Sequence, residues 1–291
     1  MILVVGATGQ VGGRVVRHLA AAGRPVRAMV RPGADAAKVR PLMAAGATMF
    51  EGDLKDADSL RKACQDVGAV VSTASATISR GEGDSIETVD RDGQLGLVDA
   101  AREAGVGHFI YLSFSGNVQG DFPLHEAKRA VESHLQASGM AYTIVRPSFF
   151  MEVWLSPHAG FDPVGGTVRV YGSGESPVSM ISLADVAAYL AGCVGNPAVL
   201  NETIELGGPE AVTWNRVIEL FERALGREIA RQHVPEAALE HRMAGAPEAL
   251  QRTLAGLALS VARGDAIDVR PALDKVNIRL TPVQEFVKRA V

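Results

Sequence analysis

Three glycines near the start of the chain have the spacing of a phosphate-binding turn. Gly6, Gly9 and Gly12 follow an apolar run at 2–5 and precede an amphipathic helical pattern. In such a turn the first glycine permits a tight bend, the second lets backbone N–H groups approach a pyrophosphate, and the third lets the helix pack on the sheet. The helix N-terminus then favours the phosphate charge. We expect cofactor contacts from Gly6, Thr8, Gly9, Gln10, Val11 and Gly12.

A basic residue ends the second expected strand, at 26–31. Arg31 stands roughly 20 residues beyond the glycines, where an acid would bind the ribose 2′-hydroxyl of NAD and an arginine accommodates the 2′-phosphate of NADP. The next acid is Asp35. Arg31 therefore predicts a preference for NADP(H) over NAD(H). The alternative is a solvated arginine at a strand end.

Alternating patterns predict the elements that position these residues. Further strands are expected at 48–50, 69–72, 109–112 and 142–145, and helices at 36–44, 60–64, 87–104 and 124–137. Strands separated by helices of this length indicate βαβ units and a parallel sheet covered on both faces. We predict an α/β fold with a Rossmann-type doubly wound parallel sheet.

Beyond residue 147 the alternation breaks down. Prolines and glycines recur between 157 and 177 and predict loops and short strands. A helix from 183, a strand at 203–206, a helix at 214–225 and an alanine-rich helical region at 235–262 follow. We expect an NAD(P)-binding domain at 1–148, completed by elements within 178–206, and a smaller, interwoven C-terminal substrate lobe at 149–291.

Composition narrows the classes of partner. The formal charge is −4 and no basic block occurs, so nucleic acid is not an expected partner. No segment has the apolar length of a membrane span, and the chain begins with the first strand, so we expect a cytosolic protein. Cys64 and Cys193 are expected to be buried hydrophobes. The seven histidines are scattered, so no metal is expected.

Several longer motifs carry a family resemblance. They are Gly-Ala-Thr-Gly-Gln-Val-Gly at 6–12, Glu-Gly-Asp-Leu at 51–54, Tyr-Leu-Ser-Phe-Ser-Gly at 111–116, and the segments 137–148, 181–187 and 206–210. With them the chain resembles the atypical short-chain dehydrogenase/reductases, in particular the NmrA-like family and its quinone-reductase-like members. The resemblance implies that Asp53 and Leu54 border the adenine. It also implies cofactor contacts from Ser72, Thr73, Ala74 and Ser148. An aspartate turn cap and an ordinary strand exit are the alternatives for 53 and 72–74.

The chain departs from this family at the catalytic end. The better-known members carry Tyr-x-x-x-Lys, in which the tyrosine protonates a carbonyl oxygen and the lysine holds the ribose. Lys128 fits the lysine, but Leu124 replaces the tyrosine. His125 is a candidate general acid, since a histidine pKa suits proton transfer near neutrality. The alternatives are a solvated histidine and a surface lysine.

Two further groups are candidates for contact with a substrate. The resemblance places Ser115, and secondarily Ser113, where the family has a substrate-polarising hydroxyl, although either could cap a turn. Phe149, Phe150 and Trp154 would form an apolar wall for a flat acceptor, or pack between lobes.

These observations favour one function over two others. The first is an NADPH-dependent reductase of a quinone-like or conjugated small molecule, because such acceptors need little proton donation. The others are a non-catalytic NADP(H)-sensing regulator and an assembly factor, each with a protein partner. The chain is expected to act as a monomer or homodimer.

Overall fold

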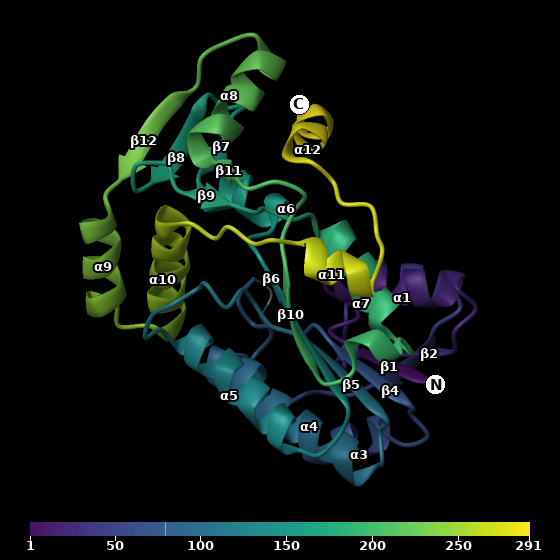
Figure 1. Ribbon diagram of the computed structural model, residues 1–291. Coiled ribbons are helices and arrows are strands. Elements are labelled where there is room, and N and C mark those ends of the chain that lie inside the picture. Colours follow the sequence, from purple (N-terminus) through teal and green to yellow (C-terminus); the bar gives the residue numbers. More distant parts are fainter. Residues whose placement is uncertain (79) are drawn as a thin grey trace. The chain divides into compact units, whose positions relative to one another are not determined.

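The structure is a computed structural model that describes residues 1–78 and 80–291 (Figure 1). The chain folds into two compact units, each assembled from separate segments of the sequence. The first unit comprises Met1–Ser113, Glu126–Val145 and Val186–Ile204, and the second comprises Phe114–His125, Arg146–Asp185 and Glu205–Val291.

A seven-stranded sheet is the main framework of the fold. Its strands are β1 (Ile2–Val5), β2 (Val26–Val30), β3 (Thr48–Glu51), β4 (Ala69–Ser72), β5 (His108–Leu112), β6 (Tyr142–Pro147) and β10 (Glu202–Leu206). They lie in the order β10-β6-β5-β4-β1-β2-β3, and the registers from β6 to β3 are all parallel. The chain order reverses between β1 and β4, as in a doubly wound sheet. The predicted Rossmann-type fold is confirmed.

Helices that lie wholly or mainly in the first unit cover both faces of this sheet. They are α1 (Gly12–Ala21), α2 (Ala36–Ala44), α3 (Ala57–Ala63), the π-helix η1 (Ile86–Gly93), α4 (Gln94–Glu103), α5 (Pro123–Ala137), α7 (Leu183–Cys193) and the 3₁₀ turn η3 (Pro197–Val199). On the α4 and α5 face, Leu97 and Val131 join Leu3 and Phe109 in one buried cluster. α1 packs on the opposite face, against β1 and β2 (Figure 1).

The single helix expected at 87–104 is confirmed over its second part and wrong in type over its first part. Residues Ile86–Gly93 form a π-helix, and only Gln94–Glu103 is α-helical. Ser85 begins it: its hydroxyl accepts the Thr88 N–H at 3.0 Å, and the Thr88 hydroxyl accepts the Ser85 N–H at 2.9 Å. A π-helix adds about one residue per turn, which hydrophobic periodicity does not reveal.

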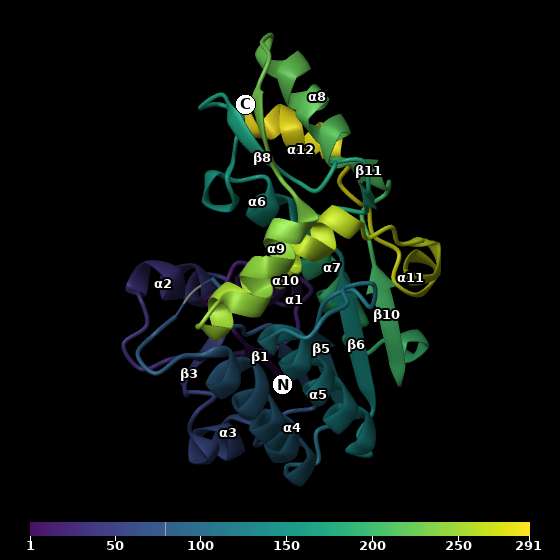
Figure 2. The same cartoon turned by 90° about the vertical axis from the view of Figure 1, so that its left-hand side faces the viewer.

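The second unit consists of shorter elements. They are α6 (Met151–Trp154), η2 (Pro157–Ala159), β7 (Phe161–Asp162), β8 (Thr167–Tyr171), β9 (Pro177–Val178), β11 (Val212–Thr213), α8 (Trp214–Leu225), β12 (Ala230–Val234), α9 (Glu236–Gly245), α10 (Ala249–Arg263), α11 (Arg270–Lys275) and α12 (Val283–Ala290). β8 pairs in parallel with β12 and antiparallel with β7, and β9 pairs with β11. The alanine-rich region forms two helices, α9 and α10, that lie side by side (Figure 1), with α9 in front of α10 in the view of Figure 2.

The surroundings of both cysteines agree with the expectation from the sequence. Cys64 and Cys193 are buried and free, as predicted. Burial raises the pKa of the Cys64 thiol to about 11 and that of Cys193 to about 12. Among the described residues, no three His, Cys, Asp or Glu side chains are grouped to hold a metal, and no helix has the length and apolar character of a membrane span.

His108, the first residue of β5, is buried within the first unit. Its Nε2 lies 2.8 Å from the Thr143 hydroxyl, which in turn donates to the Val199 carbonyl at 2.7 Å. Nε2 therefore donates to Thr143. Burial lowers the pKa of His108 to about 4, whereas a histidine in an unfolded chain titrates near ~6.5.

This difference predicts a loss of stability in acid. As the pH falls from about 6.5 to about 4, the unfolded chain takes up a proton that folded His108 does not, so the free energy of unfolding falls by about 3 kcal/mol. We expect the free energy of unfolding of His108→Gln to fall much less over the same pH range. Urea unfolding at several pH values measures it, with the exposed His18→Gln as control. The same pH dependence in the parent and in His108→Gln would contradict this origin.

Candidate cofactor-binding and active site

The motif glycines form the turn between β1 and α1, and they differ in what surrounds them. Gly6 has a φ of +81°, and a Cβ there would lie 2.8 Å from the Ala74 nitrogen. A Cβ on Gly12 would lie 2.2 Å from the Gly6 carbonyl oxygen. Gly9 is exposed, and of the described residues a Cβ there would meet only the Gly6 carbonyl, at 3.1 Å. The fold therefore needs Gly6 and Gly12, whereas Gly9 leaves the outer side of the turn open.

The start of α1 favours an anion. Val11 occupies the N-cap position and supplies no side-chain cap, and the first turn contains no acid. N–H groups at a helix start need acceptors, and the helix dipole favours negative charge there. This uncapped start beside the open side of Gly9 fits the pyrophosphate of a dinucleotide.

A cavity of about 180 Å³ adjoins this turn. It is lined by Ala7, Thr8, Gly9, Gln10, Gly13, Arg14, Arg17, Lys38, Pro41 and Leu42. Two basic residues of this lining were not singled out from the sequence. They are Arg17 on α1 and Lys38 on α2. Their positive charge makes the cavity suited to an anionic ligand.

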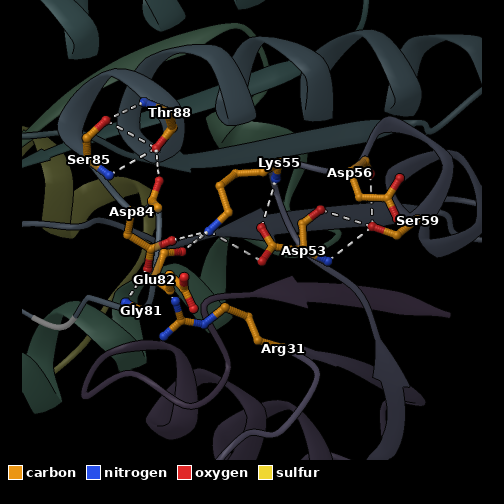
Figure 3. A network of polar contacts seen from close by, with 11 residues as sticks. Arg31, Asp53, Lys55, Asp56, Ser59, Gly81, Glu82, Asp84, Ser85 and Thr88 are labelled. Carbon is orange, nitrogen blue, oxygen red and sulfur yellow. Dashed lines mark hydrogen bonds and ion pairs between the residues drawn. The ribbon is translucent and has the colours of Figure 1, made fainter.

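Arg31 lies in a network of charged side chains (Figure 3). Its Nη1 donates to Asp84 Oδ2, and Lys55 Nζ donates to Asp84 Oδ1. Lys55 Nζ also lies 3.6 Å from Asp53 Oδ2. The Arg31 side chain remains 42% exposed, whereas the Asp84 side chain is only 4% exposed. Sequence spacing gives no signal for Asp84, because it is 53 residues from Arg31.

The two residues expected to border the adenine have different surroundings. Asp53 Oδ1 accepts the Lys55 N–H at 2.9 Å, and the Asp53 N–H donates to the Ser59 hydroxyl. The aspartate therefore caps the turn after β3. Leu54 is buried, and a Cβ on Gly93 would lie 2.8 Å from the Cβ of Leu54. Their contacts with a cofactor stay predictions.

Side-chain hydrogen bonds hold the last residue of β4 and the two residues that follow it. Ser72 is fully buried and donates to Gln94 Oε1 at 2.7 Å, and Gln94 Nε2 donates to the Ala74 carbonyl at 3.1 Å. The Thr73 hydroxyl donates to the Val5 carbonyl at 3.1 Å. These bonds fix residues 72–74 beside the glycine turn, since Ala74 is the residue that a Cβ on Gly6 would meet.

Lys128 is buried on α5 against the end of β5. Its Nζ donates to the Leu112 carbonyl at 3.1 Å, lies 4.9 Å from the centre of the Tyr111 ring, and is 3.9 Å from Asp90 Oδ1. Burial lowers the pKa of Lys128, although Asp90 and Glu132 act to raise it. A surface lysine, the alternative from the sequence, does not describe this position.

Asp90 on η1 is the partner that the sequence did not indicate. It is fully buried, and its Oδ2 accepts the Ala76 N–H at 2.9 Å. Its Oδ1 has no hydrogen-bond partner within the described part of the chain. Asp90, on the π-helix, thus lies between Ala76, which follows β4, and Lys128.

In the second unit Ser115 contacts a buried acid. The Ser115 hydroxyl donates to Asp265 Oδ1 at 2.6 Å, and Asn117 Nδ2 donates to the same oxygen at 3.0 Å. Asp265 is 1% exposed. The serine hydroxyl is therefore oriented by Asp265, a residue 150 positions away that the sequence analysis did not single out.

His125 and Leu124 also belong to the second unit. The His125 ring lies 6.1 Å from the Phe114 ring and 5.6 Å from the Phe122 ring, centre to centre. Leu124 is buried, and its N–H donates to the Thr253 hydroxyl at 3.2 Å. His125 is thus held among aromatic rings rather than fully solvated.

The two remaining serines are buried. Ser113 Oγ and Ser148 Oγ have no hydrogen-bond partner among the residues described, while the Ser148 N–H donates to the Leu206 carbonyl. An unsatisfied buried hydroxyl is unusual in a folded protein. Their predicted contacts are not tested by these bonds.

Aromatic side chains of the expected acceptor wall pack edge to face. Phe149 and Trp154 have ring centres 5.2 Å apart, and Trp154 and Tyr171 5.8 Å apart. Phe149 is buried, whereas Phe150 and Trp154 are half-buried. The structure thus brings Phe149 and Trp154 together and adds Tyr171, which the sequence analysis did not include.

The profile of the NmrA-like family matches residues 1–287. The chain belongs to the NmrA-like family. A photosystem II assembly factor of Trieres chinensis is 30% identical over 80% of the chain and 72% of its own length. An NAD(P)H azoreductase of Xenophilus azovorans is 33% identical over 79% of the chain and 75% of its own length. This NmrA-like protein thus has curated relatives with two different roles.

Solved structures show the same fold over the whole chain. An NADPH-dependent quinone oxidoreductase of Escherichia coli, complexed with NADPH, has a TM-score of 0.80 at 24% identity and covers 100% of this chain and 99% of its own. A triphenylmethane reductase of Citrobacter sp. complexed with NADP(H) has a TM-score of 0.79 at 24% identity, with the same coverage. The architecture of this NmrA-like protein therefore matches theirs.

Proposed function

We propose that this protein is an NADP(H)-dependent reductase of a quinone-like or otherwise conjugated small molecule. The observation that carries the proposal is the uncapped start of α1 beside the open side of Gly9, with Arg31 directly after the next strand, β2. The activities named for several similar proteins support it: NAD(P)H azoreductase, quinone oxidoreductase and triphenylmethane reductase. Quinones, azo compounds and triphenylmethane dyes accept electrons into a conjugated system.

Bound NADPH would supply a hydride, and the protein's own residues would hold and orient the reactants. Lys128 is proposed to bind the ribose, with its ammonium fixed by the Leu112 carbonyl and Asp90. Ser148 is proposed as a second cofactor contact. Phe149, Phe150 and Trp154 are proposed to contact the acceptor.

Proton delivery distinguishes this site from that of the tyrosine enzymes. Leu124 has no proton to donate, so His125 is proposed as the general acid and Ser115 as the group that polarises the substrate oxygen. The Asp265 carboxylate accepts the single Ser115 proton in the structure, so that hydroxyl would turn from Asp265 to the substrate oxygen in order to polarise it. Because the proton-donating tyrosine is replaced by Leu124, the site favours an acceptor whose reduced form is stable without an immediate proton transfer.

The first test is cofactor preference. We expect the chain to bind NADPH more tightly than NADH, and Arg31→Ala to weaken NADPH binding tenfold to a hundredfold, because a charge-assisted bond to the 2′-phosphate contributes on the order of 1.5–3 kcal/mol. NADH binding should be unchanged. Calorimetric titration measures both cofactors, and Arg27→Ala, which removes an arginine of the preceding strand β2, is the control. Equal affinities in the parent would overturn the proposed preference.

A second candidate function is that of an NADP(H)-sensing regulator or assembly factor. Leu124 at the proton-donor position favours it, as does the similarity to a photosystem II assembly factor. In that case the cofactor would control the capture of a protein partner without turnover. NADPH binding without its oxidation in the presence of quinones, azo dyes and triphenylmethane dyes would favour this function over the reductase.

A further inference from the structure

The Asp84 carboxylate has a position that the proposed NADP(H) preference does not explain. Each of its two oxygens accepts from a different cation, Oδ2 from Arg31 and Oδ1 from Lys55 (Figure 3). The Gly81 N–H also donates to Oδ2, at 2.6 Å. Asp84 is therefore held by the backbone on one side and by two cations on the other.

Gly81 lets Arg31 approach this carboxylate. A Cβ on Gly81 would lie 2.6 Å from Arg31 Nη1 and 3.4 Å from Asp84 Oδ2. The turn from Gly81 to Asp84 is closed by the Asp84 N–H, which donates to the Gly81 carbonyl at 3.2 Å. The guanidinium thus lies directly on the turn that carries the acid.

The charges of this network balance. Arg31 and Lys55 contribute two positive charges, and Asp53 and Asp84 contribute two negative ones. Burial would raise the pKa of Asp84, but hydrogen bonds from Lys55 and Gly81 and the charge of Arg31 hold it below the usual range. Asp84 is therefore ionised at neutral pH, and the network has no net charge with which to attract a dianion.

We propose that Asp84 is a specificity-determining residue that competes with the 2′-phosphate of NADP(H) for Arg31 and Lys55. The inference rests on the proposed role of Arg31. A 2′-phosphate that accepts from Arg31 must displace the Asp84 carboxylate or lie close to its negative charge, and either lowers affinity. NADH, which lacks that phosphate, meets neither cost. Asp84 thus lowers the ratio of NADPH affinity to NADH affinity that Arg31 would otherwise produce.

The test compares two adenosine phosphates that differ in the 2′-phosphate. Calorimetric titrations with 2′,5′-ADP and 5′-AMP are made for the parent, Asp84→Asn and Asp56→Asn. Asparagine keeps the shape of the side chain and an acceptor for the Gly81 N–H. Asp56→Asn makes the same change of charge at an aspartate in the same region whose carboxylate instead accepts the Asp58 N–H at 2.9 Å. Circular dichroism checks that each variant is folded.

We expect Asp84→Asn to bind 2′,5′-ADP about tenfold more tightly than the parent, as the loss of a like charge beside the phosphate predicts. Binding of 5′-AMP should change by less than about twofold. Asp56→Asn should change neither. In an Arg31→Ala background the gain from Asp84→Asn should shrink, because the contested guanidinium is gone.

Two results would overturn the inference in different ways. A parent that prefers 2′,5′-ADP through Arg31, but an Asp84→Asn variant with equal or weaker 2′,5′-ADP binding, would show that Asp84 does not compete and instead holds Arg31 in place. A parent that binds both ligands equally would overturn the Arg31 proposal and this inference together. If Asp84→Asn fails to fold, Asp84→Ser supplies the test: loss of the same charge should tighten 2′,5′-ADP binding and leave 5′-AMP binding unchanged, and equal effects on both would overturn the inference.

Discussion

Gly9→Val is expected to reduce NADPH affinity at least about a hundredfold and to change the free energy of unfolding by less than about 1 kcal/mol. The reason is steric. Gly9 is exposed, and among the described residues its Cβ would meet only the Gly6 carbonyl, so the valine methyls would extend into the space that a pyrophosphate needs. Circular dichroism, urea unfolding and an NADPH titration on the same variant measure both effects.

Gly12→Ala provides the matched contrast. Its Cβ would lie 2.2 Å from the Gly6 carbonyl oxygen, so the backbone must move and stability should fall. Gly9→Val should therefore impair NADPH binding alone, whereas Gly12→Ala should impair folding. NADPH affinity retained in Gly9→Val would show that the turn does not hold the pyrophosphate.

The sequence predicted most elements of the sheet because their strands are buried on both faces. β1 is a continuous apolar run, β4 is apolar up to Ser72, and α8 has a regular amphipathic pattern, so all three were located closely. β12 was not predicted, since Ala230–Val234 is polar and largely exposed and is defined by its pairing with β8. The π-helix escaped because its extra residue per turn leaves the apolar spacing ambiguous.

The candidate site shows the same division. The glycines and Arg31 lie at fixed offsets within one βαβ unit, so spacing alone indicated them. Their partners are distant in sequence: Asp84 is 53 residues from Arg31, and Asp265 is 150 residues from Ser115. Such pairs arise from tertiary packing, and one sequence carries no signal for them. Asp90 additionally depends on the π-helix that buries it.

Reductase activity is expected to be strong with quinones and weak with simple ketones. Hydride transfer to an aliphatic ketone produces a basic alkoxide that needs a proton, whereas a reduced quinone is stabilised by its ring. General acid catalysis typically supplies ~10²–10⁴-fold, so the absence of the tyrosine at Leu124 should penalise ketones by about 3–5 kcal/mol relative to quinones of similar size. A panel of quinones and aliphatic ketones assayed with NADPH measures the ratio of kcat/KM values.

His125 is the internal control for this expectation. Its ring lies beside Phe114 and Phe122, so His125→Ala removes an imidazole and leaves the two phenyl rings of the cluster. Quinone reduction should survive this change, and any residual ketone reduction should be lost if the imidazole is the acid. His134→Ala, at a half-buried histidine near the other end of α5, controls for general effects on the helix. Efficient ketone turnover that survives His125→Ala would mean that another group delivers the proton, and the acceptor preference could then no longer be attributed to the missing tyrosine.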